Sequence, residues 1–527
     1  MRFFGFEASD LVEFVIALVF VALAARRWIE AFGQRLAIST GSSMALLLVL
    51  PIILRVALLP QYPIPIPNVS DDFSYLLLAD TLRHFRLANP VHPLHPFFET
   101  FFVLQQPSYA SIFPPGQGLV LILGWAGVAL SIGGLCALCY WMLRAWITPG
   151  WALLGGLLSV MEFGPLNQWM NSFWGGAVEA CAGCLVFGAL PRLRSGGRPV
   201  NAALVGLGIG ISWLCRPYET VFLILSALVF VLPSWRSLKW AAVVFLPVLG
   251  LSLAHNKAVT GSWTTLPYQL SQYQYGVPTS FTFQQAPEPH RALTREQQLD
   301  YEQQSQVHNN AGDYWARWAG RLRFYRFFFL APLYLAIPVF FLRMGERRFA
   351  WVLLTILIFS YGTNFYPYFY SHYIAALTCL FVLIAVIGLE CLSRWNELAA
   401  QVVLLLCFAH FVFWYGIHAS RDVELDAGLS RFETWDAINH GDPLGRIAIH
   451  RQLAATPGRQ LVFVRYRPQH AFDEWVHNAA DIDAASVVWA RDLGTAENQK
   501  LLHYYPDRNA WLLEPDARPI RLQPYPR

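Results

Sequence analysis

The chain has 527 residues, of which 55% are hydrophobic, 15% aromatic and only 14% charged, and its mean hydropathy is +0.39. A soluble globular chain carries about 25% charged residues, so this depletion excludes a disordered chain, a coiled coil and a disulfide scaffold. The net charge of +4 is too small to form the basic patch of a nucleic-acid-binding protein. Repeated apolar runs, which also contain all eight cysteines, predict a polytopic membrane protein instead.

The apolar runs predict an all-α bundle of about twelve membrane spans. Lys and Arg residues gather in the short connectors between the spans. With twelve spans, all of these basic connectors fall on the same side of the membrane, which the positive-inside rule identifies as the cytoplasmic side. The segment 116–124 is predicted to be short and half-buried, because a second span there would break that parity. The predicted spans are 10–25, 40–60, 125–147, 151–168, 172–190, 201–214, 217–232, 238–254, 326–342, 348–362, 373–392 and 399–416. The basic connectors contain Arg26, Arg27, Arg35, Arg192, Arg194, Arg198, Arg236, Lys239, Arg343, Arg347, Arg348 and Arg394.

This topology leaves three long segments on the outer face: the loops 61–116 and 255–325, and the tail 418–527. Together with the transmembrane module 1–417, the tail makes a second domain, because strand-like runs alternate in it with a helix-like run. We therefore expect a small α/β domain that acts as a cap or docking platform. Its strands are predicted at 461–466, 486–490 and 510–513, and its amphipathic helix at 495–505.

The first outer loop contains two adjacent carboxylates, Asp71 and Asp72, directly after a stiff proline-rich stretch. A short helix follows, with Ser70 or Asp71 as its predicted N-cap. Capping needs one acid, and a second carboxylate at the membrane boundary adds repulsion and desolvation. The pair therefore favours a general base or a cation site, although capping alone is the alternative. The apolar stripe of the helix, predicted to lie along the membrane surface, comprises Leu78, Leu82 and Phe85.

The loop ends with Phe113-Pro114-Pro115-Gly116, which leads into the next apolar run. A span, an outer loop with paired acids, a surface helix and this Pro-Pro-Gly motif together resemble the GT-C superfamily of integral-membrane glycosyltransferases. These enzymes use polyprenyl-phosphate sugars, and they include protein O-mannosyltransferases and lipid A aminoarabinose transferases. The resemblance covers about residues 40–392. Further matching motifs are Arg216-Pro217-Tyr218-Glu219, the run from Asn256 to Ser262, and His372-Tyr373.

Two departures from the family pattern concern acidic residues. Asp72 stands where many relatives have Glu, and Glu162 is the only stand-in for an acid of the next short outer loop.

The resemblance implies sugar transfer from a polyprenyl-phosphate donor to a lipid, glycan or protein acceptor. The site would lie on the periplasmic side of a bacterial inner or plasma membrane. Asp71 would act as the general base, with Asp72 as its helper, and a single displacement would invert the anomeric configuration. The resemblance also implies that a divalent metal (Mg, Mn or Ca) binds to Asp71 and Asp72. No nucleotide is expected, because no glycine loop stands at a strand–helix junction.

A lipid phosphate at the outer boundary must meet cations, and guanidinium groups suit it by bidentate geometry. Arg216 and Glu219 can instead pair with each other, and Arg55, near a helix end, can extend its charge to the surface. The predicted donor-phosphate or substrate-binding residues are Lys257, Arg216, His372, Tyr373, Glu219, Tyr109 and Glu99. Further candidates, for phosphate or lipid head groups, are Arg321, Arg323 and Arg326, and candidates for sugar stacking or an aromatic belt are Trp169, Trp174 and Trp263.

Two other functions fit part of the pattern. A transporter or flippase of a lipid-linked sugar fits the number of spans, but such proteins have repeated halves and polar groups at mid-membrane. Here the sequence contains no repeat, and its polar residues cluster at one face. A non-catalytic assembly subunit, with the tail as its docking module, is the third possibility.

Overall fold

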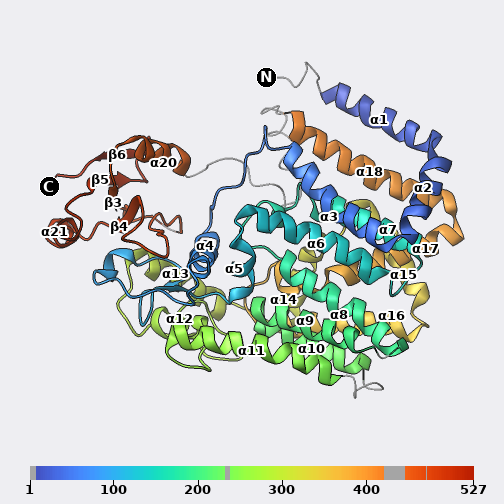
Figure 1. Cartoon of the computed structure of the whole chain (residues 1–527), viewed down its shortest axis with the longest axis horizontal. Helices are drawn as coiled ribbons and strands as arrows, with labels where there is room; N and C mark the ends of the chain where they lie inside the picture. Colours follow the sequence, from blue (N-terminus) through green and yellow to red (C-terminus); the bar gives the residue numbers. More distant parts are fainter. Residues whose placement is uncertain (1–7, 197, 232–237, 421–444, 471, 527) are drawn as a thin grey trace.

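The computed structural model describes residues 8–196, 198–231, 238–420, 445–470 and 472–526. Its helices form a bundle at one end, and a small α/β domain lies at the other (Figure 1). Within the described ranges, five helices are long and apolar enough to cross a membrane. The count of about twelve spans is not confirmed by this criterion and stays a prediction. The five candidates are Thr40–Ala57, Trp125–Leu143, Lys239–Thr260, Ser371–Trp395 and Glu397–Ala419.

Most predicted spans are helices in the bundle. Several begin with proline, whose missing N–H costs nothing in a first turn. The helix α17 is apolar on all sides and is almost entirely buried at the centre of the bundle. The bundle helices are α1 (Ala8–Ala24), α2 (Arg26–Ile38), α3 (Thr40–Ala57), α6 (Trp125–Leu143), α7 (Pro149–Phe163), α8 (Ala177–Gly196), α9 (Pro199–Cys215), α10 (Pro217–Val231), α11 (Leu238–Thr260), α16 (Arg347–Thr363), α17 (Thr378–Trp395) and α18 (Glu397–Ser420).

The predicted span 326–342 is wrong as a single helix. The chain there forms four short pieces, because Pro332 and Pro338 each remove a backbone donor and interrupt the helix. The aromatic side chains of this stretch, including Phe327 and Phe340, are nevertheless buried in the bundle core. The four pieces are η5 (Leu322–Phe328), η6 (Ala331–Leu335), α15 (Ile337–Phe340) and η7 (Phe341–Arg343).

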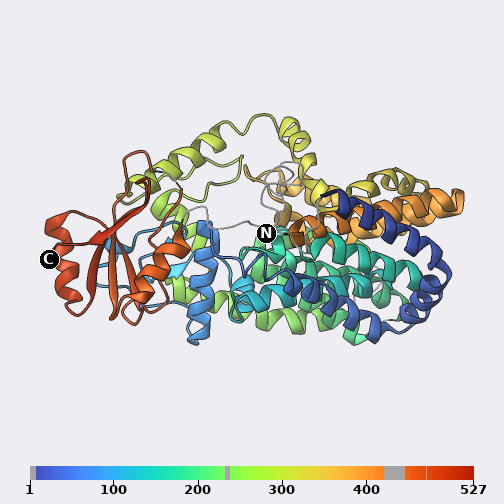
Figure 2. The same ribbon diagram turned by 90° about the horizontal axis from the view of Figure 1, so that it is seen from above.

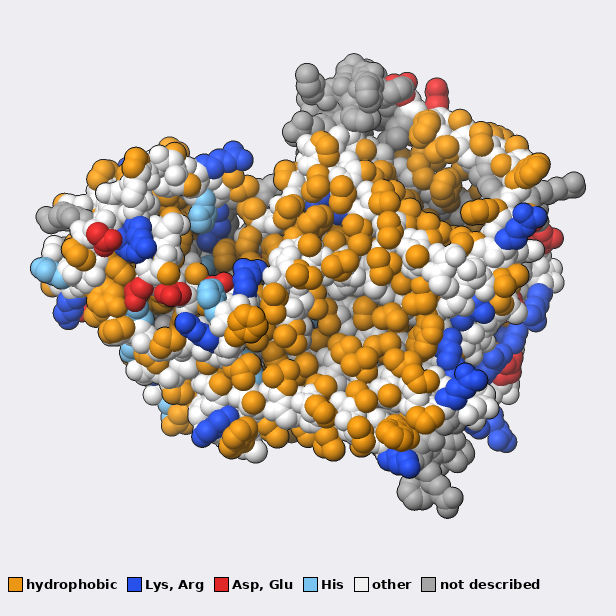
Figure 3. Space-filling view, in the orientation of Figure 1, with side chains coloured by type: hydrophobic (Ala, Val, Ile, Leu, Met, Phe, Trp, Pro, Cys, Tyr) orange, Lys and Arg blue, Asp and Glu red, His pale blue; other side chains and the backbone are white. Residues whose placement is uncertain are grey.

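Basic side chains gather at the end of the bundle that lies away from the α/β domain (Figure 3). The Arg192 guanidinium donates to the carbonyl of Trp141 at 2.8 Å, and that of Arg348 donates to Trp146 at 2.9 Å. Both carbonyls belong to the C-terminal part of α6 or the turn after it, so the C-terminal end of α8 and the N-terminal end of α16 meet there. This agrees with the expectation that the basic connectors share one side. Arg236 lies outside the described residues.

The first outer loop folds into α4 (Ser70–Arg83), η2 (His95–Phe98), the paired strands β1 (Val103–Leu104) and β2 (Ala110–Ser111), and α5 (Pro115–Leu121). The predicted cap was wrong by one or two residues, since the N-cap of α4 is Val69. The predicted apolar stripe is also wrong, because Leu78 is buried whereas Phe85 is fully exposed in a left-handed turn after the helix. The predicted short segment at 116–124 is confirmed as α5.

The α/β domain contains a four-stranded sheet in the order β4-β3-β5-β6, in which β3 is parallel to both its neighbours and β6 is antiparallel to β5. The predicted strands and helix are confirmed, α20 and β6 are additional, and residues 421–444 of the predicted tail lie outside the described residues. The elements are α20 (Arg446–Ala455), β3 (Gln460–Val464), β4 (Val487–Arg491), α21 (Thr495–Tyr504), β5 (Asn509–Glu514) and β6 (Arg521–Pro524).

This domain shares a hydrophobic core with the first outer loop. Leu77 of α4 and Phe98 of η2 belong to the same buried cluster as Leu461 and Phe463 of β3. The opposite face of the sheet packs against α20, through Leu453. The view from above shows the domain seated against the outer loops, at the end of the elongated molecule (Figure 2). The C-terminal domain is therefore part of the outer structure that surrounds the candidate site.

Candidate active site

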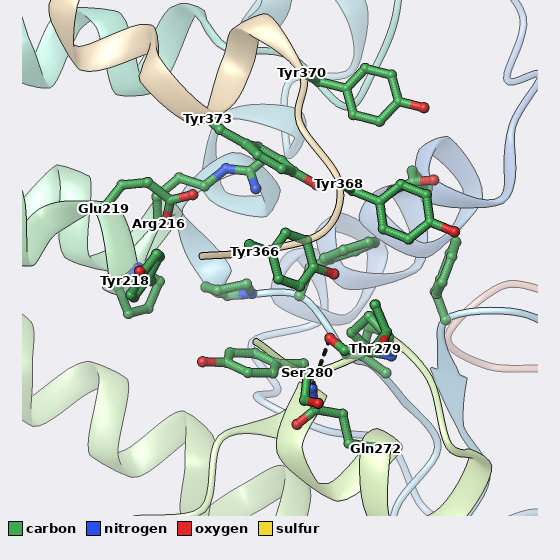
Figure 4. A pocket seen from close by; sticks show the side chains of 18 of the residues that line it. Arg216, Tyr218, Glu219, Gln272, Thr279, Ser280, Tyr366, Tyr368, Tyr370 and Tyr373 are labelled. Atoms are coloured by element: carbon green, nitrogen blue, oxygen red, sulfur yellow. Dashed lines mark hydrogen bonds between the residues drawn. The ribbon is translucent and has the colours of Figure 1, made fainter. Parts of the chain in front are cut away.

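A cavity of about 460 Å³ lies where the outer loops meet the bundle (Figure 4). Its walls come from the start of α4, the turn between α9 and α10, the second outer loop, and the segment between α16 and α17. Five of the nine predicted catalytic or binding residues line it, from three places in the sequence. They are Asp71, Arg216, Glu219, His372 and Tyr373.

The two adjacent carboxylates have different surroundings. Asp71 lines the cavity, is partly accessible, and forms no hydrogen bond with another side chain among the described residues. Asp72 is buried, and its oxygens accept backbone N–H groups of Asn68 at 3.1 Å, Val69 at 3.4 Å and Phe173 at 2.9 Å. Asp72 thus ties the first turn of α4 to the segment after α7, while Asp71 faces the cavity. The capping alternative describes Asp72, and the general-base interpretation fits Asp71.

Burial raises the pKa of Asp71 to about 7, and the nearby charges of Asp72 and Asp300 act in the same direction, whereas Arg216 opposes them. Burial also raises the pKa of Asp72, although the backbone donors act to lower it. A carboxyl group with a pKa near neutrality is suited to accept a proton from a substrate hydroxyl.

The Pro-Pro-Gly motif brings Asp71 and Arg216 to the same cavity. A side chain at Gly116 would lie 2.8 Å from the carbonyl oxygen of Leu214, so α5 packs directly on the end of α9. A side chain at Gly118 would lie 2.6 Å from Leu78, so the other side of α5 packs on α4. Only glycine allows both approaches, and α5 therefore sets the distance between the two walls.

Arg216 follows the last residue of α9, and Pro217 opens α10, so the chain reverses at this point. The guanidinium carbon lies 4.7 Å from the ring centroid of Tyr373, within the range of a cation–π contact. The predicted alternative of a pair with Glu219 is not supported, because no ion pair joins the two side chains in the part of the chain that the structure describes. Both line the cavity (Figure 4).

An aromatic group covers the cavity between α16 and α17. His372 contacts Trp174 edge-on at 5.1 Å between ring centroids and stacks on Tyr370 at 5.6 Å. Arg321 is buried, and it donates to the carbonyls of Thr363, Tyr366 and Pro367. It therefore holds the loop that carries these rings, rather than meeting a substrate. Of the three predicted tryptophans, Trp174 alone lines the cavity.

Four predicted site residues lie outside the lining. Asp72 has the structural contacts described above, and the exposed Lys257 donates to the carbonyl of Gly261 at 2.6 Å. Glu99 is buried and accepts from Arg291, Tyr275 and Gln297, which joins the two outer loops. The hydroxyl of Tyr109 donates to the carbonyl of Asn478 in the C-terminal domain at 3.1 Å. The contacts of Asp72, Glu99 and Tyr109 support the walls of the cavity, whereas the bond of Lys257 stays within its own turn.

Two further expectations about charged residues are corrected. Arg55 does not extend to the surface: it is buried, and it donates to Asn171 at 2.7 Å and to the carbonyls of Tyr62 and Pro63. It ties the end of α3 to the loop that leads to α4. Glu162, the stand-in acid, faces a separate small pocket among apolar side chains of α7 and α17.

The described residues do not fit the divalent metal that the resemblance implies. No group of three His, Cys, Asp or Glu side chains gathers within the described ranges. Asp72 is buried and its oxygens point to backbone N–H groups, whereas Asp71 lines the cavity, so the two carboxylates do not face one common point. Hard divalent cations take six or more oxygen ligands. The chemistry proposed below therefore uses no metal.

Sequence reasoning missed several residues of the lining. Tyr366 and Tyr368 lie beside the predicted His372-Tyr373 motif, and Tyr75 lies one helical turn after Asp71. The second outer loop contributes Gln272 and Asp300. A signal existed for the tyrosines, because four alternate with other residues from 366 to 373 at a span boundary.

Neither a protein-family model nor a curated protein sequence matches the chain. Among solved structures, ArnT from Cupriavidus metallidurans in the apo state matches with a TM-score of 0.52 and 12% identity, over 90% of this chain and 93% of that one. The same protein bound to undecaprenyl phosphate gives 0.49 and 11%, over 88% and 92%. The archaeal oligosaccharyltransferase AglB from Archaeoglobus fulgidus, in complex with an inhibitory peptide and a dolichol-phosphate, gives 0.38 and 10%, over 90% and 69%.

The chain is thus similar in fold to ArnT over most of its length. ArnT has the GT-C glycosyltransferase fold, so the GT-C fold predicted from the sequence is confirmed.

Proposed function

We propose that the protein transfers a sugar from a polyprenyl-phosphate donor to an acceptor hydroxyl at the outer face of a membrane. One observation carries this proposal: Asp71, with no side-chain partner among the described residues, faces the same cavity as the Arg216 guanidinium. A base and a phosphate-binding cation on one cavity are what this reaction requires. The shared fold supports it further, since ArnT has been solved with undecaprenyl phosphate bound.

In the proposed step the Asp71 carboxylate accepts the proton of the acceptor hydroxyl. The acceptor oxygen forms a bond to the anomeric carbon as the bond from that carbon to the phosphate oxygen breaks, and the polyprenyl phosphate leaves with the electron pair. Arg216 stabilises the charge that develops on the leaving phosphate. A single displacement of this kind inverts the anomeric configuration.

The transporter alternative is less well supported. A transporter of a lipid-linked sugar is expected to have its polar groups near the middle of the membrane. Here Asp71 lies in the first turn of α4, in the outer loop, and Arg216 lies between two helices at their outer ends. The charged groups of the cavity therefore lie at one end of the bundle, where the outer loops cover it.

The experiment measures release of undecaprenyl phosphate from lipid-linked sugars extracted from bacterial membranes, together with the acceptor fraction of those membranes, by mass spectrometry. Asp71→Asn should lower turnover about 10²–10⁴-fold, the usual contribution of a general base, while undecaprenyl phosphate still binds. Glu302→Gln, which removes an exposed carboxylate from α13 (Arg295–Asn309), is the matched control and should be fully active. Full activity of Asp71→Asn would exclude this function.

A further inference from the structure

The outer wall of the cavity is built from the second outer loop, and its chemistry differs from that of the wall containing Arg216. The wall comprises α12 (Pro267–Tyr275), the segment 278–284 and α13. Figure 4 shows Gln272, Thr279 and Ser280 on this side, with Tyr366 between them and Arg216. Its polar lining consists of amides, hydroxyls and one carboxylate. Among them are Gln269, Gln272, Thr279, Ser280, Asp300 and Gln304.

The polar groups of α13 are buried and ordered in advance. Asp300 and Gln304 are one turn apart and only 8% and 7% exposed. The Gln304 amide donates to both oxygens of Asp300 at 3.1 Å and accepts the backbone N–H of Thr279 at 2.9 Å. Each carboxylate oxygen has two lone pairs, so Asp300 can still accept further hydrogen bonds from a ligand. A buried acceptor of this kind is suited to hydroxyl donors.

The charges of the cavity are unequal. Among the described residues that line it, Arg216 is the one Arg or Lys side chain, whereas Asp71, Glu219 and Asp300 are three carboxylic acids. A donor phosphate at Arg216 uses this cation. A second phosphate, on the acceptor, would then face carboxylates with no other Arg or Lys side chain of the described lining to pair with it, and a buried charge without a partner is costly.

We propose that the outer wall, with Asp300 and Gln304 at its centre, binds an uncharged, hydroxyl-rich sugar and selects against a phosphorylated one. The amides and the carboxylate bind hydroxyl groups, and the rings of Tyr366 and Tyr368 supply apolar surface for a sugar face. The proposal rests on the proposed function, in which Arg216 binds the donor phosphate.

The test uses the full-length protein in detergent, with undecaprenyl phosphate added to occupy Arg216. Saturation-transfer NMR compares neutral methyl glycosides (gluco, galacto and manno) with their 6-phosphates. At least one neutral glycoside should bind ten times more tightly than its phosphate. Gln304→Leu should weaken neutral binding at least tenfold. Asp300→Asn should improve binding of the phosphate, whereas Glu302→Gln, an equal charge change on the exposed face of α13, should not.

Each of three results would overturn the proposal. The 6-phosphates could bind as tightly as the neutral glycosides, no neutral glycoside could bind at all, or Asp300→Asn and Glu302→Gln could change binding of the phosphate equally. Binding of undecaprenyl phosphate itself, with Arg216→Ala as its negative variant, tests the proposed function separately. Replacing that lipid by undecaprenyl-phosphate glucose identifies the source of the sugar. If the methyl glycoside still binds when this sugar-carrying lipid is present, the wall binds the sugar of an acceptor. If the lipid displaces the methyl glycoside, the wall binds the donor's own sugar.

Discussion

The ring of Phe73 stacks on the imidazole of His477, with 3.9 Å between ring centroids and an angle of 5° between the planes. Phe73 follows Asp71 and Asp72 directly, and His477 belongs to the C-terminal domain. The guanidinium of Arg446 lies 4.8 Å from the same phenyl ring, and a carboxylate oxygen of Asp80 accepts the backbone N–H of Ala480 at 2.8 Å. The C-terminal domain therefore holds both ends of α4, the helix that presents Asp71 to the cavity.

Removal of this contact should impair catalysis rather than donor binding. We expect His477→Ala to lower kcat about tenfold, because a displacement of the base by a fraction of an ångström costs rate steeply, while the Kd for undecaprenyl phosphate is unchanged. His477→Phe, which keeps a stacked ring, should restore activity. Because burial keeps the pKa of His477 well below its usual value, the ring is neutral and the pH profile should not shift. His503→Ala, on the exposed side of α21, is the control and should keep its kcat. A fall in kcat of His503→Ala as large as that of His477→Ala would contradict the positioning role of His477.

The reaction should depend on pH through Asp71. A base must be deprotonated, so kcat/KM should fall as the pH drops through about 7 and should level off above it. The negative charge of Asp300 contributes to the raised pKa of Asp71, so Asp300→Asn should move the inflection to lower pH. A pH–rate profile of both proteins measures this. If Asp71→Glu shows its inflection at the same pH as the wild type, the inflection belongs to a group other than the side chain at position 71.

The C-terminal domain is joined to the second outer loop through Arg491, which pairs with Glu474 of its own domain and with Glu296 of α13. All three side chains are almost fully buried. We expect Arg491→Met to destabilise the domain by about 3–5 kcal/mol, because it leaves two buried carboxylates without their cation. Arg521→Met, which breaks an exposed pair with Glu514, should cost about 0–1 kcal/mol. Hydrogen exchange in β3 and β4 reports the difference, and equal protection in both variants would refute it.

The close packing of α5 should make Gly116 sensitive to substitution. The Cβ of an alanine there would lie 2.5 Å from Cys215 and 2.8 Å from the backbone of Leu214, so the variant must shift α5 or α9. Overpacking of this kind costs about 1–3 kcal/mol, and the shift would move Arg216 relative to Asp71. Gly150→Ala has open space around it in α7 and should be neutral. Thermal stability and transfer activity, measured for both variants, test this.

The donor set described above predicts activity without an added metal. Because Asp72 is engaged by backbone N–H groups, EDTA treatment of the purified protein should leave sugar transfer unchanged. The metal that the family resemblance implies would instead be supported by two results together. EDTA would abolish activity, and Mg²⁺ or Mn²⁺ would restore it in the wild type but not in Asp71→Asn. Full activity in EDTA together with inactive Asp71→Asn assigns Asp71 the role of base alone.

The helical bundle and the strands of the C-terminal domain could be predicted from the sequence, because apolar runs and alternating residues indicate helices and strands. The acid pair was conspicuous because adjacent charges in an apolar chain are costly. It could not separate Asp71 from Asp72, since their difference arises from Phe173, about a hundred residues away in the chain. It also placed Lys257 and Glu99 at the correct end of the bundle but on the wrong side of the cavity wall. Position along a span predicts depth, whereas position around the bundle depends on helix packing.

The polar wall on α13 was missed for a related reason. A helix without an apolar stripe is typical of a solvent-exposed segment, yet Glu296, Asp300 and Gln304 are buried against the C-terminal domain and the cavity. Burial of such a helix depends on partners from elsewhere in the chain, here Arg491 and Thr279. The tyrosines at 366 and 368 were missed because rings at a span boundary are also typical of an interfacial belt.

The contact between Asp80 and Ala480 joins residues that are 400 positions apart. During synthesis the N-terminal part of a chain emerges and folds first, so α4 lacks this support until Ala480 has been translated. A chain that stops earlier keeps the contacts of α4 with α5 and with Phe173, but it lacks those of Asp80 with Ala480 and of Phe73 with His477. Under the proposed function, such a product holds Asp71 less firmly and should transfer sugar more slowly.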